Sequence, residues 1–271
     1  MRKVTALLLA LVMCLSLASC GGSSNSAEEQ EAPASAASDL QNVQSKGTLV
    51  VGITDFEPMD YKDENGNWIG FDADLATAFA ESLGVSVEFA EINWDNKILE
   101  LDGGSIDCIW NGMTLTDEVT SAASCSNPYM RNAQVVVLPA DKAEEYADIE
   151  SLAGLTFAVE SGSAGEEAVN ELGYATTPVT AQADALMEVA AGTSDAAVID
   201  LLMAYAMVGE GTSYDNLTYT FTLNEEQYGV AFRQDSDLTD ALNAFFAAQY
   251  ADGSLDALAE QYGLAGSVIP Q

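Results

Sequence analysis

Three polar turns in the sequence follow short apolar runs, at places where a binding site can form. Residues 110–114 (WNGMT) and 161–165 (SGSAG) are two of them, and residues 54–59 (TDFEPM) are the third. Glycine allows close backbone approach, threonine offers an N–H and a hydroxyl, and small residues opening a helix can receive a carboxylate on free N–H groups. Asp200 adds a carboxylate at the end of a buried strand. These groups suit recognition of a small polar molecule.

Each candidate also has a purely structural interpretation. Phe56 can stack on a ligand or pack under its own loop, and Glu57 can pair with a ligand cation or lie in solvent. Thr114 and Asp200 are each compatible with a helix N-cap. Trp110 suits either the wall of a pocket or the core. The sequence leaves these alternatives open.

Strands and helices must position these turns, and they alternate along the chain. Apolar, β-branched runs predict strands at 49–53, 85–92, 106–110, 134–138, 155–159, 196–199, 217–221 and 228–232. Helical spacing predicts helices at 72–83, 96–101, 166–172, 183–191, 201–208, 238–250 and 255–262. The alternation favours an α/β fold with parallel sheets. Two such sets, before and after 134–138, suggest two lobes.

Six segments in order resemble one known family. They include "GNWIGFDADLATAFAESLG", "INWDNKILELDGGSIDCIWNGMTLTDE", "SNPYMRNAQVVV", "LAGLTFAVESGSAGEEAV", "SDAAVID" and "YGVAFRQDS". Together they resemble the polar amino-acid-binding group of extracytoplasmic solute-binding proteins of ABC importers. The resemblance covers about residues 46–262.

The resemblance implies a two-lobe clamshell of the periplasmic-binding-protein type, joined by two hinge crossovers. Lobe one is expected at 46–133 plus 228–271, and lobe two at 134–227. The crossovers would lie near 132–138 and 221–230. The ligand is expected between the lobes, which close around it.

The site residues carried over from the resemblance lie mainly in these turns. Asp200 would pair with the ligand α-amino group, Ser163 and Ala164 would contact its carboxylate, and Phe56 would be the stacking aromatic ring. The full set of candidate ligand-binding residues is Phe56, Glu57, Trp110, Asn111, Gly112, Met113, Thr114, Arg131, Gly162, Ser163, Ala164 and Asp200.

One position departs from the family. Val119 stands where the family usually has an arginine that grips the ligand carboxylate. Three alternatives follow: Arg131 substitutes for it, backbone N–H groups suffice, or the ligand lacks a free carboxylate and is cationic. The identity of the ligand is therefore open.

The N-terminus predicts export and lipid attachment. Arg2 and Lys3 precede an apolar run, and the signal peptide is expected at 1–19. The ending "LASC" resembles a lipobox, which implies lipid on Cys20 and cleavage before it. Residues 20–45 are small, polar and acidic, so we expect a flexible, lipid-anchored tether.

The composition excludes several functions. Without Arg2 and Lys3 the chain keeps six basic and 43 acidic residues, a net charge near −37, which argues against nucleic acid as a partner. Histidine is absent, so His-based triads are excluded, and no metal or other cofactor is expected. Cys108 and Cys125 can be free core thiols or a disulfide.

The sequence therefore predicts a non-enzymatic, monomeric binding protein, held at the membrane by lipid. It would pass a small amino-acid-like ligand, with a cationic ligand as one alternative, to an ABC-transporter permease. A ligand sensor for a signalling receptor is one alternative. A dehydratase-like enzyme on the same fold is another, in which Glu57 or Asp200 would act as acid or base.

Overall fold

The computed structural model describes residues 38–146 and 148–271. The predicted signal peptide, Cys20 and most of the predicted tether lie outside the described residues. None of the helices described is both long and apolar enough to cross a bilayer.

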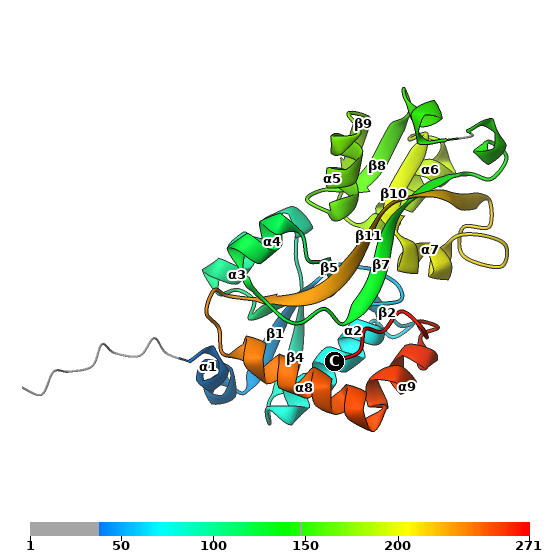
Figure 1. Ribbon diagram of the computed structural model, residues 1–271. Coiled ribbons are helices and arrows are strands. Elements are labelled where there is room, and N and C mark those ends of the chain that lie inside the picture. The colour runs from blue at the N-terminus through cyan, green and yellow to red at the C-terminus, as the bar shows by residue number, and fades with distance from the viewer. Residues whose placement is uncertain (1–37, 147) are drawn as a thin grey trace, which may run out of the picture. The chain divides into compact units, whose positions relative to one another are not determined.

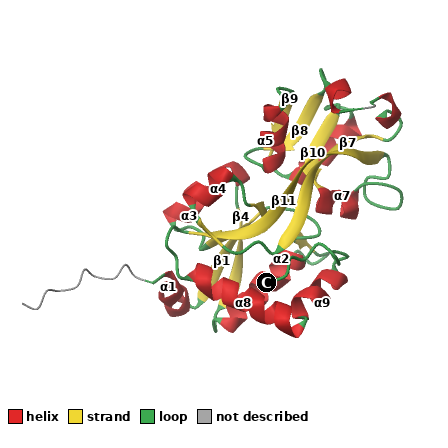
Figure 2. Cartoon of the chain, viewed as in Figure 1, coloured by secondary structure: helices red, strands yellow, loops and turns green. Residues whose placement is uncertain are grey.

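One nine-stranded sheet runs through the described part of the chain (Figures 1 and 2), with strand order β4-β1-β5-β11-β7-β10-β8-β9 and β6 beside β11. Its strands are β1 (Thr48–Ile53), β4 (Ser86–Glu91), β5 (Cys108–Thr114), β6 (Ser124–Cys125), β7 (Met130–Pro139), β8 (Thr156–Glu160), β9 (Ala175–Val179), β10 (Ala196–Asp200) and β11 (Leu217–Phe232). Strands β2 (Tyr61–Lys62) and β3 (Trp68–Ile69) form a separate hairpin.

Helices gather around each end of this sheet (Figure 1). Around β1, β4 and β5 lie α1 (Asp39–Lys46), α2 (Phe71–Ser82), α3 (Lys97–Gly103), α4 (Asp117–Ala122), α8 (Leu238–Asp252) and α9 (Ser254–Gln261). Around β8, β9 and β10 lie α5 (Ala164–Glu171), α6 (Gln182–Ala191) and α7 (Leu201–Met207). We call the first group lobe one and the second lobe two. The mixed α/β fold predicted from the alternation is confirmed, and the last two helices pack on lobe one.

Within each lobe the strands pair in parallel, and the central ones are largely buried, as expected when helices cover a sheet. β1 pairs in parallel with β4 and β5, and β8 pairs in parallel with β9 and β10. Every residue of β10 is buried. Residues 110–114, expected as a turn, form the end of strand β5 itself, whereas 161–165 follow β8 and Asp200 ends β10, so all three lie at carboxyl ends of strands.

β7 and β11 are the two crossovers, and they differ from the prediction. Two short strands were expected at 217–221 and 228–232, yet the chain forms one continuous strand, β11, that covers both segments and the residues between them. β11 pairs antiparallel with β7 from Leu217 to Tyr228, and this pairing joins the sheets of the two lobes into one. The intervening residues 222–227 are mostly exposed, and only Leu223 and Glu226 are partly buried, so this part of the strand is largely solvated. Because these residues are mostly polar, apolar runs in the sequence do not predict a strand here.

Apolar side chains pack on both faces of the sheet. The largest buried cluster spans both lobes and includes Val51, Trp110, Phe246 and Leu186. A second cluster around Leu101 and Ile109 belongs to lobe one, and a third around Phe157 and Val169 belongs to lobe two. Cys108 and Cys125 are free thiols, so the alternative of a disulfide is not realised.

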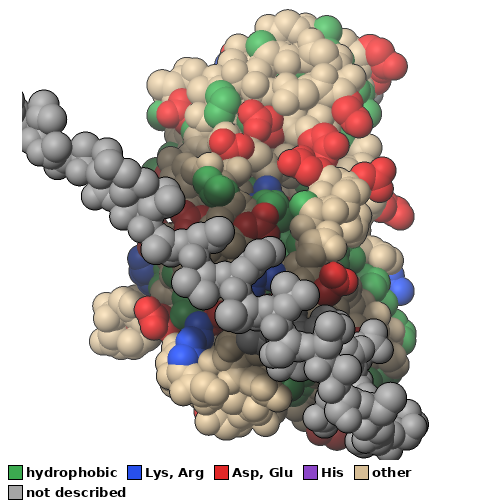
Figure 3. All heavy atoms as spheres, turned by 90° about the vertical axis from the view of Figure 1, so that its left-hand side faces the viewer, with side chains coloured by type: hydrophobic (Ala, Val, Ile, Leu, Met, Phe, Trp, Pro, Cys, Tyr) green, Lys and Arg blue, Asp and Glu red, His purple; other side chains and the backbone are tan. Residues whose placement is uncertain are grey.

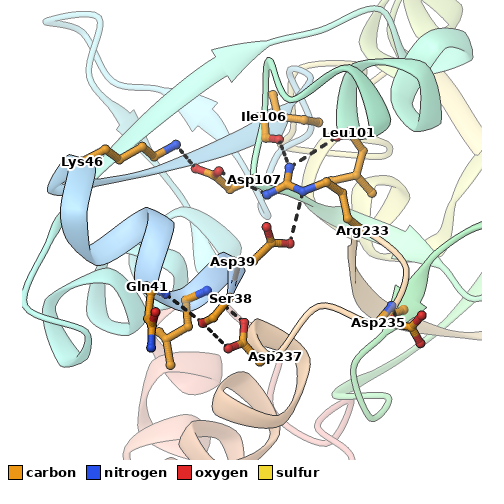
Figure 4. Close-up of polar contacts among 12 residues, drawn as sticks. Ser38, Asp39, Gln41, Lys46, Leu101, Ile106, Asp107, Arg233, Asp235 and Asp237 are labelled. Carbon is orange, nitrogen blue, oxygen red and sulfur yellow. Dashed lines mark hydrogen bonds and ion pairs between the residues drawn. The ribbon is translucent and has the colours of Figure 1, made fainter. Parts of the chain in front are cut away.

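Helix α1 differs from the prediction that residues 20–45 form a flexible tether. Ser38 caps the helix, and Asp237 accepts hydrogen bonds from the Ser38 hydroxyl and from the Leu40 N–H. Arg233 donates to Asp39, and Lys46 pairs with Asp107 at 2.5 Å, as Figure 4 shows. These long-range polar contacts order a segment whose own composition favours disorder.

Candidate functional site

A cavity of about 480 Å³ lies among turns from both lobes. Figure 3 shows the molecule from the side on which α4 and α5 lie, with a hollow at mid-height and acidic side chains near it. Eight of the predicted residues line the cavity: Asn111, Gly112, Met113, Thr114, Gly162, Ser163, Ala164 and Asp200. Segments that are distant in sequence therefore converge here, and a volume of about 300–1,000 Å³ is typical of small-molecule sites.

The lobe-one wall is the end of β5, and buried side chains hold its backbone. Asn111 accepts from the Thr54 N–H at 2.8 Å and donates to the Thr54 hydroxyl at 3.1 Å. Gly112 has φ +54°, and a Cβ built there would lie 2.5 Å from the ring of Phe56. Only glycine fits this turn, which explains its place in the sequence.

Asp72 fixes the same turn from behind. Its Oδ2 accepts from the Gly112 N–H at 2.6 Å and from the Tyr129 hydroxyl at 2.7 Å. Burial raises the pKa of Asp72 to about 7, against the lowering effect of these hydrogen bonds. Asp72 lies in the segment "GFDADLA", which carries part of the family resemblance, but the sequence does not indicate that this side chain binds the distant Gly112 N–H.

The lobe-two wall begins at the turn before α5. Ser163 caps α5, since its hydroxyl accepts from the Glu166 N–H at 3.1 Å. The Gly162 N–H donates to the Glu166 carboxylate at 2.8 Å. The N–H groups of Ala164 and Gly165 have no acceptor among the described residues. Free N–H groups at a helix N-terminus are available to an anion.

Asp200 lies deeper in the cavity, with 3% of its surface exposed. Its Oδ1 accepts from the Asn132 amide, from the Gln134 amide at 3.1 Å and from the Tyr228 hydroxyl at 2.6 Å, while its Oδ2 accepts from the Gln182 amide. Although Asp200 precedes α7, its side chain does not cap that helix. Burial and the charge of Glu226 raise its pKa well above the ordinary value.

Four predicted residues lie away from this cavity. Phe56 is 1% exposed and packs edge-on to Tyr228 beneath Gly112, so it supports the turn from inside. Trp110 is fully buried against Phe79 and Phe246. Glu57 is half-buried, and burial raises its pKa.

Arg131 is the fourth of these residues. It lines a neighbouring pocket, and its Nη1 donates to the Val268 carbonyl at 3.2 Å.

Sequence reasoning missed many of the lining residues, among them Trp94, Lys97, Gln134, Glu160 and Gln182. Lys97 is the single basic residue of the cavity wall, and its ammonium donates to the Gly162 carbonyl at 2.8 Å, from one lobe to the other. Burial lowers the pKa of Lys97. Val119, also on the wall, is 4% exposed, and its N–H donates to the hydroxyl of Thr116, which caps α4. Thr114 is therefore not the cap of that helix.

Comparison with known proteins gives consistent matches. The family described as bacterial extracellular solute-binding proteins, family 3, matches residues 49–265. The arginine-binding extracellular protein ArtP of Bacillus subtilis (strain 168) is 28% identical over 268 residues, which are 97% of this chain and 98% of the relative.

Two solved structures extend the comparison. A mutant of ArgBP from T. maritima superposes with a TM-score of 0.78 and 34% identity, over 83% of this chain and 99% of that chain. The ancestral amino acid-binding protein AncCDT-1, described as a precursor of cyclohexadienyl dehydratase, gives 0.76 and 32% identity over 83% and 99%. The two-lobe architecture and the family match agree, and the chain belongs to family 3 of the bacterial extracellular solute-binding proteins.

Proposed function

We propose that this protein binds an amino acid or a closely related polar solute between its lobes and delivers it to the permease of an ABC importer. The observation that carries this proposal is the cavity, where polar turns of both lobes meet and Asp200 lies buried. ArtP, which is similar over nearly the whole length, is named as an arginine-binding protein, and ArgBP has been solved with arginine bound. The cavity has the size and polarity for such a ligand.

Two seats in the cavity suit the two ends of an amino acid. The ligand ammonium would bind Asp200 through Oδ2, which accepts from one protein donor, Gln182. The ligand carboxylate would lie at the free N–H group of Ala164, which lines the cavity as Lys97 does. Backbone N–H groups and Lys97 would thus bind the carboxylate in place of the arginine that the family usually has at the position of Val119. Arg131 makes a backbone contact outside the cavity, which does not support it as the substitute.

The lobes would close by bending at the crossovers. Lobe one would comprise 46–133 with 228–271, lobe two would comprise 134–227, and both boundaries fall inside β7 and β11. Register shifts in the β7–β11 pairing lie between Tyr219 and Asn224, and Asn224 pairs with Gln134 at the first boundary. A few residues that absorb a change in backbone angle are enough for a hinge.

Lipid attachment at Cys20 and a monomeric, extracytoplasmic protein complete the proposal. The support is the segment "LASC" after an apolar run, together with membership of an extracellular family. Binding without turnover is part of the same proposal, since AncCDT-1 is itself described as amino acid-binding. Recovery of an unchanged ligand after incubation, observed by NMR, would agree with it.

Isothermal titration calorimetry with the purified protein tests the binding function. The panel is the twenty common amino acids, citrulline, and amines that lack a carboxylate. We expect at least one amino acid to bind with a Kd far below millimolar. Binding of amines alone would contradict the proposed binding site for the ligand carboxylate. If no member of the panel binds below millimolar, the proposed function is contradicted.

A further inference from the structure

Two carboxylates end adjacent parallel strands in lobe two. Glu160 is the last residue of β8 and Asp200 is the last residue of β10, and these strands pair in parallel. Both residues line the cavity, and they are 2% and 3% exposed. The sequence draws attention to Asp200 alone, although Glu160 occupies the equivalent place on the neighbouring strand.

The two carboxylates differ in what surrounds them. Protein donors already hold both oxygens of Asp200. The Oε1 atom of Glu160 is buried and has no hydrogen-bond partner among the described residues. A buried polar atom without a partner carries a large penalty, and natural proteins keep few of them. The Oε1 atom of Glu160 is therefore prepared for a donor that the described residues do not provide.

The one cation of the cavity wall does not fill that role. The ammonium of Lys97 donates to the carbonyls of Gly162 and Trp94 and lies 5.0 Å from the Trp94 ring centre. It forms no ion pair within 4.0 Å with Glu160 in the described structure. Burial raises the pKa of Glu160 to about 8, and hydrogen bonding with Thr54 and Gln182 together with the positive charge of Lys97 opposes this rise only in part.

The rest of the cavity has a strongly negative character. Glu118, Glu166, Glu167 and Glu171 line it together with Glu160 and Asp200, against Lys97 as the single base. Such a concentration of negative charge around a partly enclosed space favours a ligand with net positive charge. A zwitterion with a neutral side chain would leave this field uncompensated.

We propose that Glu160 binds a second cationic group of the ligand, remote from its α-amino group, and so selects amino acids with positively charged side chains. This inference rests on the proposed function and names its substrate class. Guanidinium and ammonium groups both carry several N–H donors, and either can satisfy the Oε1 atom.

Arginine and citrulline provide the decisive pair of ligands, because they have nearly the same shape and differ in side-chain charge. In calorimetry at pH 7.5 we expect the wild-type protein to bind arginine at least about tenfold more tightly than citrulline. In Glu160→Gln the arginine affinity should fall about 10- to 100-fold while citrulline changes by less than about twofold. Glu150→Gln is the matched control, since it removes the same charge from an exposed residue of lobe two that does not line the cavity, and it should preserve the ratio.

Three outcomes overturn the inference and leave the proposed function intact. In the first, the wild type binds arginine no more tightly than citrulline. In the second, Glu160→Gln weakens the binding of both ligands equally. In the third, the wild type binds only other amino acids. The first and third use the wild type alone, so a folding defect of the variant cannot hide them. Failure of every amino acid to bind is a different result, and it contradicts the proposed function itself.

Discussion

The two walls of the cavity are built on different principles. In lobe one the wall is backbone held by buried side chains: Asp72 binds the Gly112 N–H, Asn111 binds Thr54, and Phe56 fills the space behind. In lobe two the wall is a row of side-chain carboxylates at strand ends and on α5, among them Glu160, Asp200 and Glu166. Lobe one therefore determines much of the shape of the site, and lobe two supplies most of its negative charge.

This difference predicts different responses to mutation. Changes in the lobe-one wall should disturb folding and binding of every ligand together. Changes in the lobe-two wall should leave the fold in place and alter which charges the ligand can carry. The following tests are ordered by the size of the expected effect.

Gly112→Ala should have the largest effect, because the new Cβ meets the Phe56 ring and the backbone is left-handed there. We expect a loss of about 2–5 kcal/mol in the free energy of unfolding, from backbone strain and overpacking together. Gly104→Ala is the control: its φ of +75° is similar, but nothing lies within 4 Å of the added carbon. It should lose only about 1–2 kcal/mol in urea unfolding. Equal losses for the two variants would mean that the contact with Phe56 does not constrain the turn.

Asp200→Asn should weaken binding about 10- to 100-fold for any α-amino ligand, since a charge-assisted hydrogen bond contributes about 1.5–3 kcal/mol. The Kd from calorimetry measures this loss, and near-ultraviolet circular dichroism verifies that the fold is retained. Glu225→Gln, at an exposed position of β11, removes the same charge and should change the Kd by less than about twofold. A similar loss in both variants would point to the general field of the protein, with no specific role for Asp200.

The pH dependence of affinity should separate the two lobe-two carboxylates. Lys97, Asp184, Thr54 and Gln182 surround Glu160, and burial is the main cause of its raised pKa of about 8. Below that pH a cation must displace a proton, so arginine affinity should rise with pH by up to about tenfold per unit and level off above about pH 8.

Citrulline serves as the internal reference for this titration. Its neutral side chain cannot respond to Glu160, although its α-amino group still responds to Asp200, whose pKa is also raised. The ratio of the two affinities between pH 6 and 9 therefore isolates Glu160. A ratio that does not change with pH would contradict the role of Glu160 in binding a side-chain cation.

Much of the fold follows from local sequence. The apolar runs that predict β1, β4 and β10 and the spacing that predicts α2 and α8 correspond to elements within a few residues of the observed bounds. These segments satisfy their own hydrogen-bond and burial needs, so local patterns suffice. The continuous strand β11 and helix α1 were missed because distant partners, β7 and Arg233, stabilise them.

The same distinction holds for the candidate site. The turns 111–114 and 162–164 could be located from the sequence because small and polar residues follow apolar runs. Phe56 could not be placed, since the side of the loop to which its ring turns depends on the space above Gly112. Glu160 had a signal that was overlooked: an acid directly after the buried run 157–159, as Asp200 follows 196–199. Its importance depends on missing donors, which only coordinates reveal.

The paired crossovers have a mechanical consequence. A ribbon of two hydrogen-bonded strands bends or twists with small changes in bond angle, whereas sliding one strand along the other breaks its bonds. β7 and β11 form such a ribbon over most of their length. Release of the ligand should therefore be a rotation about this ribbon with its register intact. The bonds that break are cross-cleft ones such as that from Lys97 to Gly162, and amide protons along the ribbon should exchange equally slowly in both states.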